Sequence, residues 1–364
     1  MNEKELSLFK LILSADIGSI RFFRLLERFG NEESILKAGK KDLMSVEGIG
    51  STLSEAILNV SVSGKAEKEL ELAKKNNIAV VLYTDSNYPK PLRELPGKPL
   101  VLYIKGGVLE KDFESISIVG SRKISNYGKT ATSEFASYFA KKGITIISGL
   151  ARGVDTLAHI TALENKSRTI AVLGNGLLVN YPPENKKLQE AIEQNGAVIS
   201  EFPLKQPPNK GAFPRRNRII AGLSKAALLT EAGIRSGASI TARFCAEFGK
   251  DVFAVPGSIY SDMSKGTNDL IQNGAYIALS PQNMTEQLGW LPKREMKKPI
   301  EMNSLDKIET AVLNLIENNS DGLPSDLIAE KLNLDISETS TALLKLEITG
   351  LIKSTPGQIY IRTY

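Results

Sequence analysis

A basic segment in the middle of the chain has the clearest capacity for chemistry. Its 16 residues from Lys210 to Lys225 hold five basic side chains and no carboxylate. Between those two lysines lie Phe213, Arg215, Arg216, Asn217 and Arg218. A guanidinium binds phosphate through charge-assisted hydrogen bonds, and an aromatic ring stacks on a nucleobase whatever its identity. The segment therefore predicts a surface that binds single-stranded nucleic acid.

The same segment has a second interpretation. Ile219, Ile220 and Leu223 follow helical spacing, so they could pack on a core while the basic side chains face solvent. One or more of the arginines could also pair with Glu201 or Glu231. The residues alone leave both interpretations open.

Glycine-rich turns at 120–122, 148–155 and 174–176 each follow an apolar run that predicts a buried strand. The carboxyl ends of parallel strands meet at one edge of a sheet, where open α/β sheets bind ligands. Helices that begin at such turns direct backbone N–H groups toward an anion. We therefore expect a phosphate-binding crevice that also brings Arg122 and Arg152 close to the basic segment.

Several other chemistries are disfavoured. No turn continues into a Gly-x-Gly-x-x-Gly run and no Walker A sequence occurs, so neither a dinucleotide nor a nucleoside triphosphate cofactor is expected. Cys245 is the one cysteine and His159 the one histidine, which rules out an internal disulfide and a cysteine- or histidine-rich metal site. Cys245 stands among apolar residues and is predicted to be core. We expect no metal and no cofactor.

Three acid–base candidates remain. Asp155 and His159 are one helical turn apart, so they could form an acid–base pair, although a structural role is favoured. Glu231 lies in a polar loop after an apolar run. It could contact a ribose, act as a base or organise the arginines.

The elements that must position these residues alternate regularly from residue 115 onward. Apolar runs occur at 116–119, 144–147, 169–173, 197–199, 226–230, 251–255 and 275–279, with helix-like stretches between most of them. Nearly all-apolar strands that alternate with helices are typical of a parallel sheet covered on both faces. The sequence predicts an α/β fold with a Rossmann-like, doubly wound, mostly parallel sheet.

The two ends of the chain differ from this pattern. Residues 1–65 are predicted to form a helical domain, in which Val46 to Ser51 resembles the turn of a helix-hairpin-helix (SAM-like) unit or a simple tight turn. Residues 66–290 form the extended Rossmann-like domain, and the basic, proline-containing stretch 291–303 is a predicted linker. Residues 304–364 predict three helices and a β-hairpin, which indicates a winged helix.

The overall composition sets looser limits. The 364 residues are 42% hydrophobic and 24% charged, and the net charge of +5 permits a nucleic-acid partner without requiring one. No apolar run approaches the ~18 residues of a membrane span, and the N-terminus lacks a signal peptide. We therefore expect a cytoplasmic protein with no membrane partner.

Ordered motifs along the chain resemble the DprA/Smf family, the DNA-processing protein A of natural transformation. The motifs are IVGSR at 118–122, SGLARGVDTLAH at 148–159, SEFP at 200–203, FPRRNRIIAGLS at 213–224, TEAGIRSGASITA at 230–242, VFAVPG at 252–257 and GTNDLIQNGA at 266–275. The resemblance is strongest over residues 80–280. Both ends fit the longer members, which carry a helical N-terminal domain and a C-terminal winged helix.

The resemblance implies a cytoplasmic single-stranded DNA-binding protein rather than an enzyme. Such proteins protect incoming DNA, help load the RecA recombinase and form homodimers. The family's DNA pocket maps onto Arg122 as a phosphate clamp and onto Lys210 and Phe213. Further DNA-binding candidates from the same motifs are Ser121, Asn217 and Arg218, and the secondary, supporting candidates are Gly120, Arg152, Arg215, Arg216 and Glu231. No residue is assigned a catalytic role.

Two other functions have weaker support in the sequence. The sheet type also resembles nucleotide-cleaving phosphoribohydrolases, but the loop Thr230–Gly237 lacks their Pro-Gly-Gly-x-Gly-Thr run. A sequence-specific regulator would use the winged helix, yet the predicted recognition helix at 338–349 has one lysine, Lys345, and two glutamates. That charge matches DNA poorly and favours protein contacts.

Overall fold

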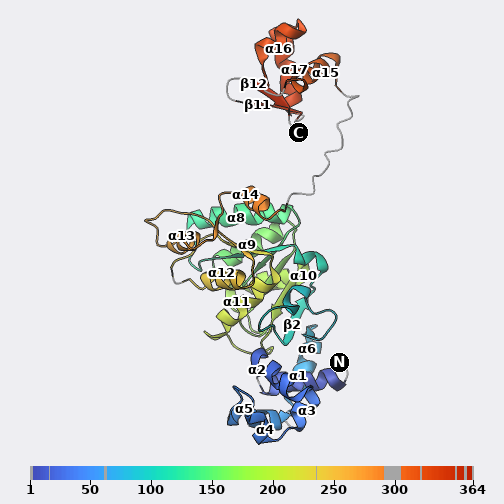
Figure 1. Cartoon of the computed structure of the whole chain (residues 1–364), viewed down its shortest axis with the longest axis vertical. Helices are drawn as coiled ribbons and strands as arrows, with labels where there is room; N and C mark the ends of the chain where they lie inside the picture. Colours follow the sequence, from blue (N-terminus) through green and yellow to red (C-terminus); the bar gives the residue numbers. More distant parts are fainter. Residues whose placement is uncertain are drawn as a thin grey trace. The chain divides into compact units, whose positions relative to one another are not determined.

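The computed structural model describes residues 3–15, 17–60, 64–234, 236–290, 305–319, 322–348, 351–355 and 359–362. The chain divides into two compact units, Met1–Leu291 and Pro292–Tyr364, and each is described by itself (Figure 1). The predicted linker at 291–303 lies outside the described residues.

The first unit begins with short helices, as predicted. They are α1 (Glu3–Ala15), α2 (Ser19–Phe29), α3 (Glu32–Lys37), α4 (Lys40–Met44), α5 (Ser51–Leu58) and α6 (Lys65–Lys75), drawn in blue in Figure 1. The glycine turn predicted between two helices joins α4 to α5, and Gly48 takes a φ of 84° there, which only glycine adopts without strain. Phe9 packs edge-on against Tyr103 at 6.5 Å between ring centroids, so these helices share a core with the sheet.

Nine strands form one sheet in this unit. They are β1 (Ala79–Leu82), β2 (Val101–Gly106), β3 (Ser115–Val119), β4 (Thr145–Ser148), β5 (Thr169–Val172), β6 (Ala197–Ser200), β7 (Ala226–Leu229), β8 (Asp251–Ala254) and β9 (Tyr276–Ile277). Their order is β1-β2-β6-β5-β4-β3-β7-β8-β9. Strands β3 to β9 are parallel to one another, whereas β2 is antiparallel to both β1 and β6. The predicted Rossmann-like, mostly parallel sheet is confirmed.

Helices cover both faces of the sheet. The bounds are α7 (Lys90–Arg93), α8 (Asn126–Lys141), α9 (Val154–Glu164), α10 (Lys186–Asn195), α11 (Ala212–Leu223), α12 (Ala238–Glu247), α13 (Lys265–Gln272) and α14 (Pro281–Gln287), with 3-10 turns η2 (Glu110–Phe113) and η3 (Pro183–Asn185). Ile116 and Ile118 of β3 pack with α8 and α9, while Val119 packs with α11 and α12. Successive strand residues point to opposite faces, which explains why β3 is apolar on both sides.

The second unit has the predicted winged-helix elements. They are α15 (Lys307–Glu317), β10 (Leu323–Pro324), α16 (Ser325–Leu332), α17 (Ile336–Ile348), β11 (Ile352–Thr355) and β12 (Ile359–Arg362), with antiparallel strand order β10-β12-β11. Lys345 on α17 lies 2.8 Å from Glu309 and 3.5 Å from Asp306. The one lysine of the predicted recognition helix is therefore already bound to acidic side chains.

None of the helices within the described ranges has both the length and the apolar character needed to cross a lipid bilayer.

Lys250, which directly precedes β8, binds the carboxyl-terminal end of α11. Its ammonium donates hydrogen bonds to the carbonyl oxygens of Ala221 at 2.8 Å, Gly222 at 2.7 Å and Ser224 at 2.6 Å. These carbonyls lie at the helix end, where no further turn can supply N–H partners. Burial lowers the pKa of Lys250, and it raises the pKa of the neighbouring core thiol Cys245 to about 12. The prediction that Cys245 is core is confirmed.

We expect Lys250→Met to lower the free energy of unfolding by about 2 kcal/mol, because it leaves partly buried carbonyls without a donor. Denaturant unfolding measures this change. Lys187→Met, which removes an exposed charge on α10, is the matched control and should shift stability by less than about 0.5 kcal/mol. Equal stability of the two variants would show that solvent replaces the ammonium at the helix end.

Candidate nucleic-acid interface

A hollow of about 820 Å³ opens at the carboxyl ends of β3 and β7. The chain order of the sheet reverses here, since β4, β5 and β6 follow on one side of β3, and β7 and β8 lie on the other. Loops that leave such a switch point diverge to opposite faces and leave a crevice between them. We call this hollow the switch-point groove; its lining includes Ser121, Arg122, Lys123, Lys210 and Phe213.

The turn after β3 is held in place by close backbone contacts. The Ser121 N–H donates to the carbonyl of Glu231 at 2.7 Å, and the Ser121 carbonyl accepts from the Val154 N–H at 3.1 Å. A Cβ on Gly120 would lie 2.6 Å from the Val154 side chain, so only glycine fits. The Ser121 hydroxyl is used locally, because it accepts from the Lys123 N–H at 3.1 Å and donates to the Lys123 carbonyl at 2.9 Å.

Cationic and aromatic groups meet at this turn. The Arg122 guanidinium lies 5.3 Å from the centre of the Phe213 ring, and the centre of the Tyr181 ring lies 5.7 Å from the same point. Phe213 also packs on Gly174, where a Cβ would be only 2.7 Å from the ring. The structure thus brings together two of the predicted DNA-binding residues, Arg122 and Phe213.

The exposed cations of the groove carry charge that no carboxylate offsets. Among the residues that the structure describes, Arg122, Lys123 and Lys210 form no ion pair with a carboxylate. Asp155 is the one carboxylate in the described lining, and it is buried and bonded to backbone. The groove therefore presents uncompensated positive charge beside an aromatic ring.

Arg216 lies beneath the groove rather than on its surface. It is 4% exposed and donates to the carbonyls of Gly149 and Val172, which terminate β4 and β5. Burial lowers the pKa of Arg216 to about 10, with Arg122 adding to the effect and Asp155 opposing it. Arg216 remains charged at neutral pH and supports the loops, so it is not an exposed phosphate ligand.

Asp155 and His159 have separate structural contacts, as the favoured interpretation predicted. The Asp155 carboxylate accepts the N–H groups of Gly149 at 3.1 Å and Ala151 at 3.4 Å, and burial raises its pKa. His159 Nδ1 lies 2.6 Å from the Thr169 hydroxyl. Burial lowers the pKa of His159 to about 3, so the imidazole is neutral.

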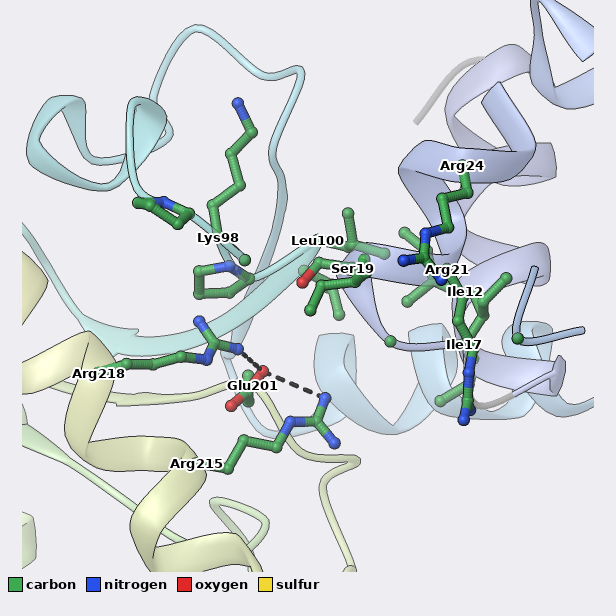
Figure 2. A pocket seen from close by; sticks show the side chains of 18 of the residues that line it. Ile12, Ile17, Ser19, Arg21, Arg24, Lys98, Leu100, Glu201, Arg215 and Arg218 are labelled. Carbon is green, nitrogen blue, oxygen red and sulfur yellow. Dashed lines mark hydrogen bonds and ion pairs between the residues drawn. The ribbon is translucent and has the colours of Figure 1, made fainter. Parts of the chain in front are cut away.

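The expectation that the whole basic segment faces one groove is wrong for Arg215 and Arg218. Both guanidiniums turn to the other side of α11 and bind Glu201, at 3.3 Å and 2.5 Å respectively (Figure 2). Helix geometry explains the split, because positions three apart share a face and neighbouring positions do not. The alternative prediction that an arginine pairs with Glu201 is confirmed. Lys225 also lies elsewhere and pairs with Glu114 at 2.5 Å.

Three further predicted residues have structural partners. Arg152 stands beside the groove but binds Glu184 through two nitrogens. Asn217 lines the groove and donates to the Gly237 carbonyl at 3.1 Å, which ties α11 to the turn before α12. Glu231 is 2% exposed, and its carboxylate accepts from the Ser125 N–H at 2.9 Å and from the Ser125 hydroxyl. Glu231 thus organises the turn after β3 and not the arginines.

Among the cationic and aromatic residues of the described lining, sequence reasoning missed two, Lys123 and Tyr181. Lys123 directly follows Arg122 in the glycine turn, so its position carried a signal. Tyr181 lies seven residues after the β5 turn glycine Gly174 and reaches Phe213 only through the path of the folded loop. No cluster of metal-ligating side chains occurs in the described part of the chain.

Comparisons with known proteins agree with this architecture. Residues 79–289 match the family model of DNA recombination-mediator protein A, and residues 297–358 match that of the DprA winged helix domain. Protein Smf of Synechocystis is 34% identical over 95% of this chain and 96% of its own length.

Solved structures are similar as well. DNA processing protein A (DprA) from Streptococcus pneumoniae superposes with a TM-score of 0.69 at 33% identity, over 79% of this chain and 99% of that chain. DNA processing protein A from Helicobacter pylori gives 0.53 at 32% identity, over 58% of this chain and 96% of that chain. The Helicobacter pylori structure concerns the single-stranded DNA binding mode of that protein.

We expect the imidazole signal of His159 to stay unchanged between about pH 8 and pH 5 in NMR spectra of the folded protein. The unfolded chain binds this proton near pH 6.5 and the folded chain does not. This group therefore lowers the free energy of unfolding as the pH falls below about 6.5. One histidine makes the signal unambiguous. A midpoint near 6.5 in the folded protein would mean that the ring is hydrated.

Proposed function

The chain belongs to the DNA recombination-mediator protein A family, also called DprA/Smf, and from this premise we propose that its switch-point groove binds single-stranded DNA without reading sequence. The observation that carries the proposal is the uncompensated charge of Arg122 and Lys210 in the same groove as the ring of Phe213. The DNA-binding mode described for the Helicobacter pylori relative supports it.

The geometry suits an unpaired strand. Arg122 and Lys210 neutralise phosphates, while the ring of Phe213 can stack only on a base that is not already stacked in a duplex. Every base has a flat apolar face, so stacking and phosphate contacts tolerate any sequence. The buried charge of Arg216 adds to the positive potential from below.

We propose binding rather than catalysis. Glu231 is the residue that a hydrolase-like reaction would need as a base, and it is buried with its carboxylate engaged by Ser125. A regulator that acts through the winged helix has no supporting observation either, because Lys345 is bound to Glu309 and Asp306.

The cellular role is also a proposal. By family membership, we assign this protein to the protection of incoming DNA in transformation and to loading of the RecA recombinase in the cytoplasm. We propose that it works as a homodimer. The edge strand β9 supports self-association, since Tyr276, Ile277 and Leu279 expose 48%, 39% and 68% of their surface at the end of the described sheet.

We expect Arg122→Ala and Lys210→Ala each to weaken binding of an oligothymidylate about tenfold, and binding of mixed sequences equally. Each variant should also reduce the slope of log affinity against log salt by about 0.7, because one fewer counterion is released. Fluorescence anisotropy at several salt concentrations measures both. Lys187→Ala removes an equal charge away from the groove and should bind like the parent. Parental affinity in both groove variants would refute the assignment.

We expect Phe213→Ala to lose about 1–3 kcal/mol of binding free energy with an unchanged salt slope, because it removes stacking and no charge. Phe213→Tyr keeps the aromatic face and should retain most of the affinity. Thermal unfolding of both variants controls for the packing of this ring on Gly174. Equal affinities of the alanine and tyrosine variants would show that the ring only shapes the groove.

A further inference from the structure

A second cavity, of about 770 Å³, lies on the opposite side of α11 from the switch-point groove. It is lined by residues of α1, α2, the glycine turn at Gly48, the loop 96–100, the segment after β6, and α11 and α12 (Figure 2). We call it the junction cavity. Arg122, Lys210 and Phe213, which we propose bind DNA in the groove, do not line it.

One wall carries two arginines that share one carboxylate. Arg218 binds Glu201 Oε2 at 2.5 Å, and Arg215 approaches the same oxygen at 3.3 Å. The Arg215 side chain is 46% exposed. The other oxygen of Glu201 and one nitrogen of Arg218 are buried without a hydrogen-bond partner in the described structure. These three groups therefore carry one more positive than negative charge, and one nitrogen of Arg218 has a donor that no described group accepts.

A second wall, formed by α2 and the turn at Gly48, also carries two arginines. Arg21 Nε and Arg24 Nη1 each lie 3.6 Å from the position that a Cβ on Gly48 would take. Arg24 pairs with Glu47 at 3.3 Å and donates to its carbonyl at 3.2 Å. Arg21 forms no ion pair with any residue in the described ranges. This wall therefore carries two guanidiniums, of which only that of Arg24 is paired with a carboxylate among the described residues.

The remaining charged groups of the lining do not neutralise the excess of positive charge from these arginines. Glu247 is engaged by Arg243 at 3.4 Å. The ammonium of Lys98 turns away to the Arg93 carbonyl at 2.7 Å and lies 5.4 Å from the centre of the Phe23 ring. The cavity thus keeps an excess of positive charge on both walls, which attracts an anion strongly in a partly enclosed space.

The rest of the lining is apolar. It includes Ile12, Ile17, Leu100, Phe244 and Phe248. A bare inorganic anion would leave this surface uncovered, whereas a ligand with an anionic end and a flat apolar body would use both parts. The volume lies within the range of about 300–1,000 Å³ that is typical of small-ligand sites.

We propose that the junction cavity binds a nucleotide, with its phosphate at the arginines of the lining and its base against the apolar residues. Guanidinium pairs match phosphate oxygens in charge and geometry. The nucleotide is either free or one unit of a longer strand. This assignment is independent of DNA binding in the groove, because the two sites have no charged lining residue in common.

Calorimetric titration of the full chain with deoxyadenosine monophosphate tests the proposal. We expect saturable binding that is at least about tenfold tighter than for deoxyadenosine or inorganic phosphate. Arg21→Gln and Arg215→Gln should each weaken it about tenfold or more. Arg28→Gln removes an equal charge from the same helix, α2, outside the cavity, and should have no effect. In Arg122→Ala, where the groove has lost its phosphate clamp, the binding step of the cavity should remain, which separates this site from the groove.

A second titration distinguishes the two sources of the nucleotide. If the cavity binds one nucleotide of a longer strand, the free mononucleotide need not bind. Arg21→Gln then weakens binding of a long oligothymidylate, but it does not weaken binding of a short one that occupies only the groove. The proposal is overturned by unchanged affinity for both mononucleotide and long strand in Arg21→Gln and Arg215→Gln. Phosphate that binds as tightly as the mononucleotide, or loss of mononucleotide binding in Arg122→Ala, would also overturn it.

Discussion

The buried guanidinium of Arg216 is the interaction on which the binding edge of the sheet depends. It joins the carbonyl that ends β4 to the carbonyl that ends β5, and it does so from α11, which packs over both strands. Carbonyls at the ends of parallel strands have no ladder partner, so without a donor they would need water in the core. The Arg216 guanidinium therefore links the ends of two strands and fixes α11 against them. It also forms the base of the groove, below the exposed side chains.

The same helix divides one basic segment into three environments. Phe213 and Asn217 line the switch-point groove, Arg216 points into the sheet, and Arg215 and Arg218 face Glu201 on the opposite side. A helix turns about 100° per residue, so adjacent arginines must diverge. The segment thus supplies an aromatic contact, an internal cross-link and an outer charged cluster.

Much of the fold could be predicted from the sequence because its signals are local. The runs from 116–119 to 275–279 are apolar on both faces, and each became a parallel strand. The positions of Gly120 and Arg122 could also be predicted, since a glycine turn that follows a buried strand lies at the edge of the sheet where such folds bind ligands. The partner of each arginine could not be predicted from neighbouring residues in the sequence. It depends on which carboxylate or carbonyl the fold brings near, and Glu201 and Val172 reach α11 only through the sheet order. The junction cavity, which joins Arg21, Gly48 and Arg215, has no signature in any one segment.

Arg122 on the surface of the groove and Arg216 beneath it also act on each other. Arg216 is charged at neutral pH, and the positive charge of Arg122 contributes to the lowering of its pKa. A phosphate held by Arg122 would place a negative charge near both guanidiniums and relieve that repulsion. Arg216, which joins the ends of β4 and β5, in this way also adds to the attraction that we propose the groove has for a polyanion.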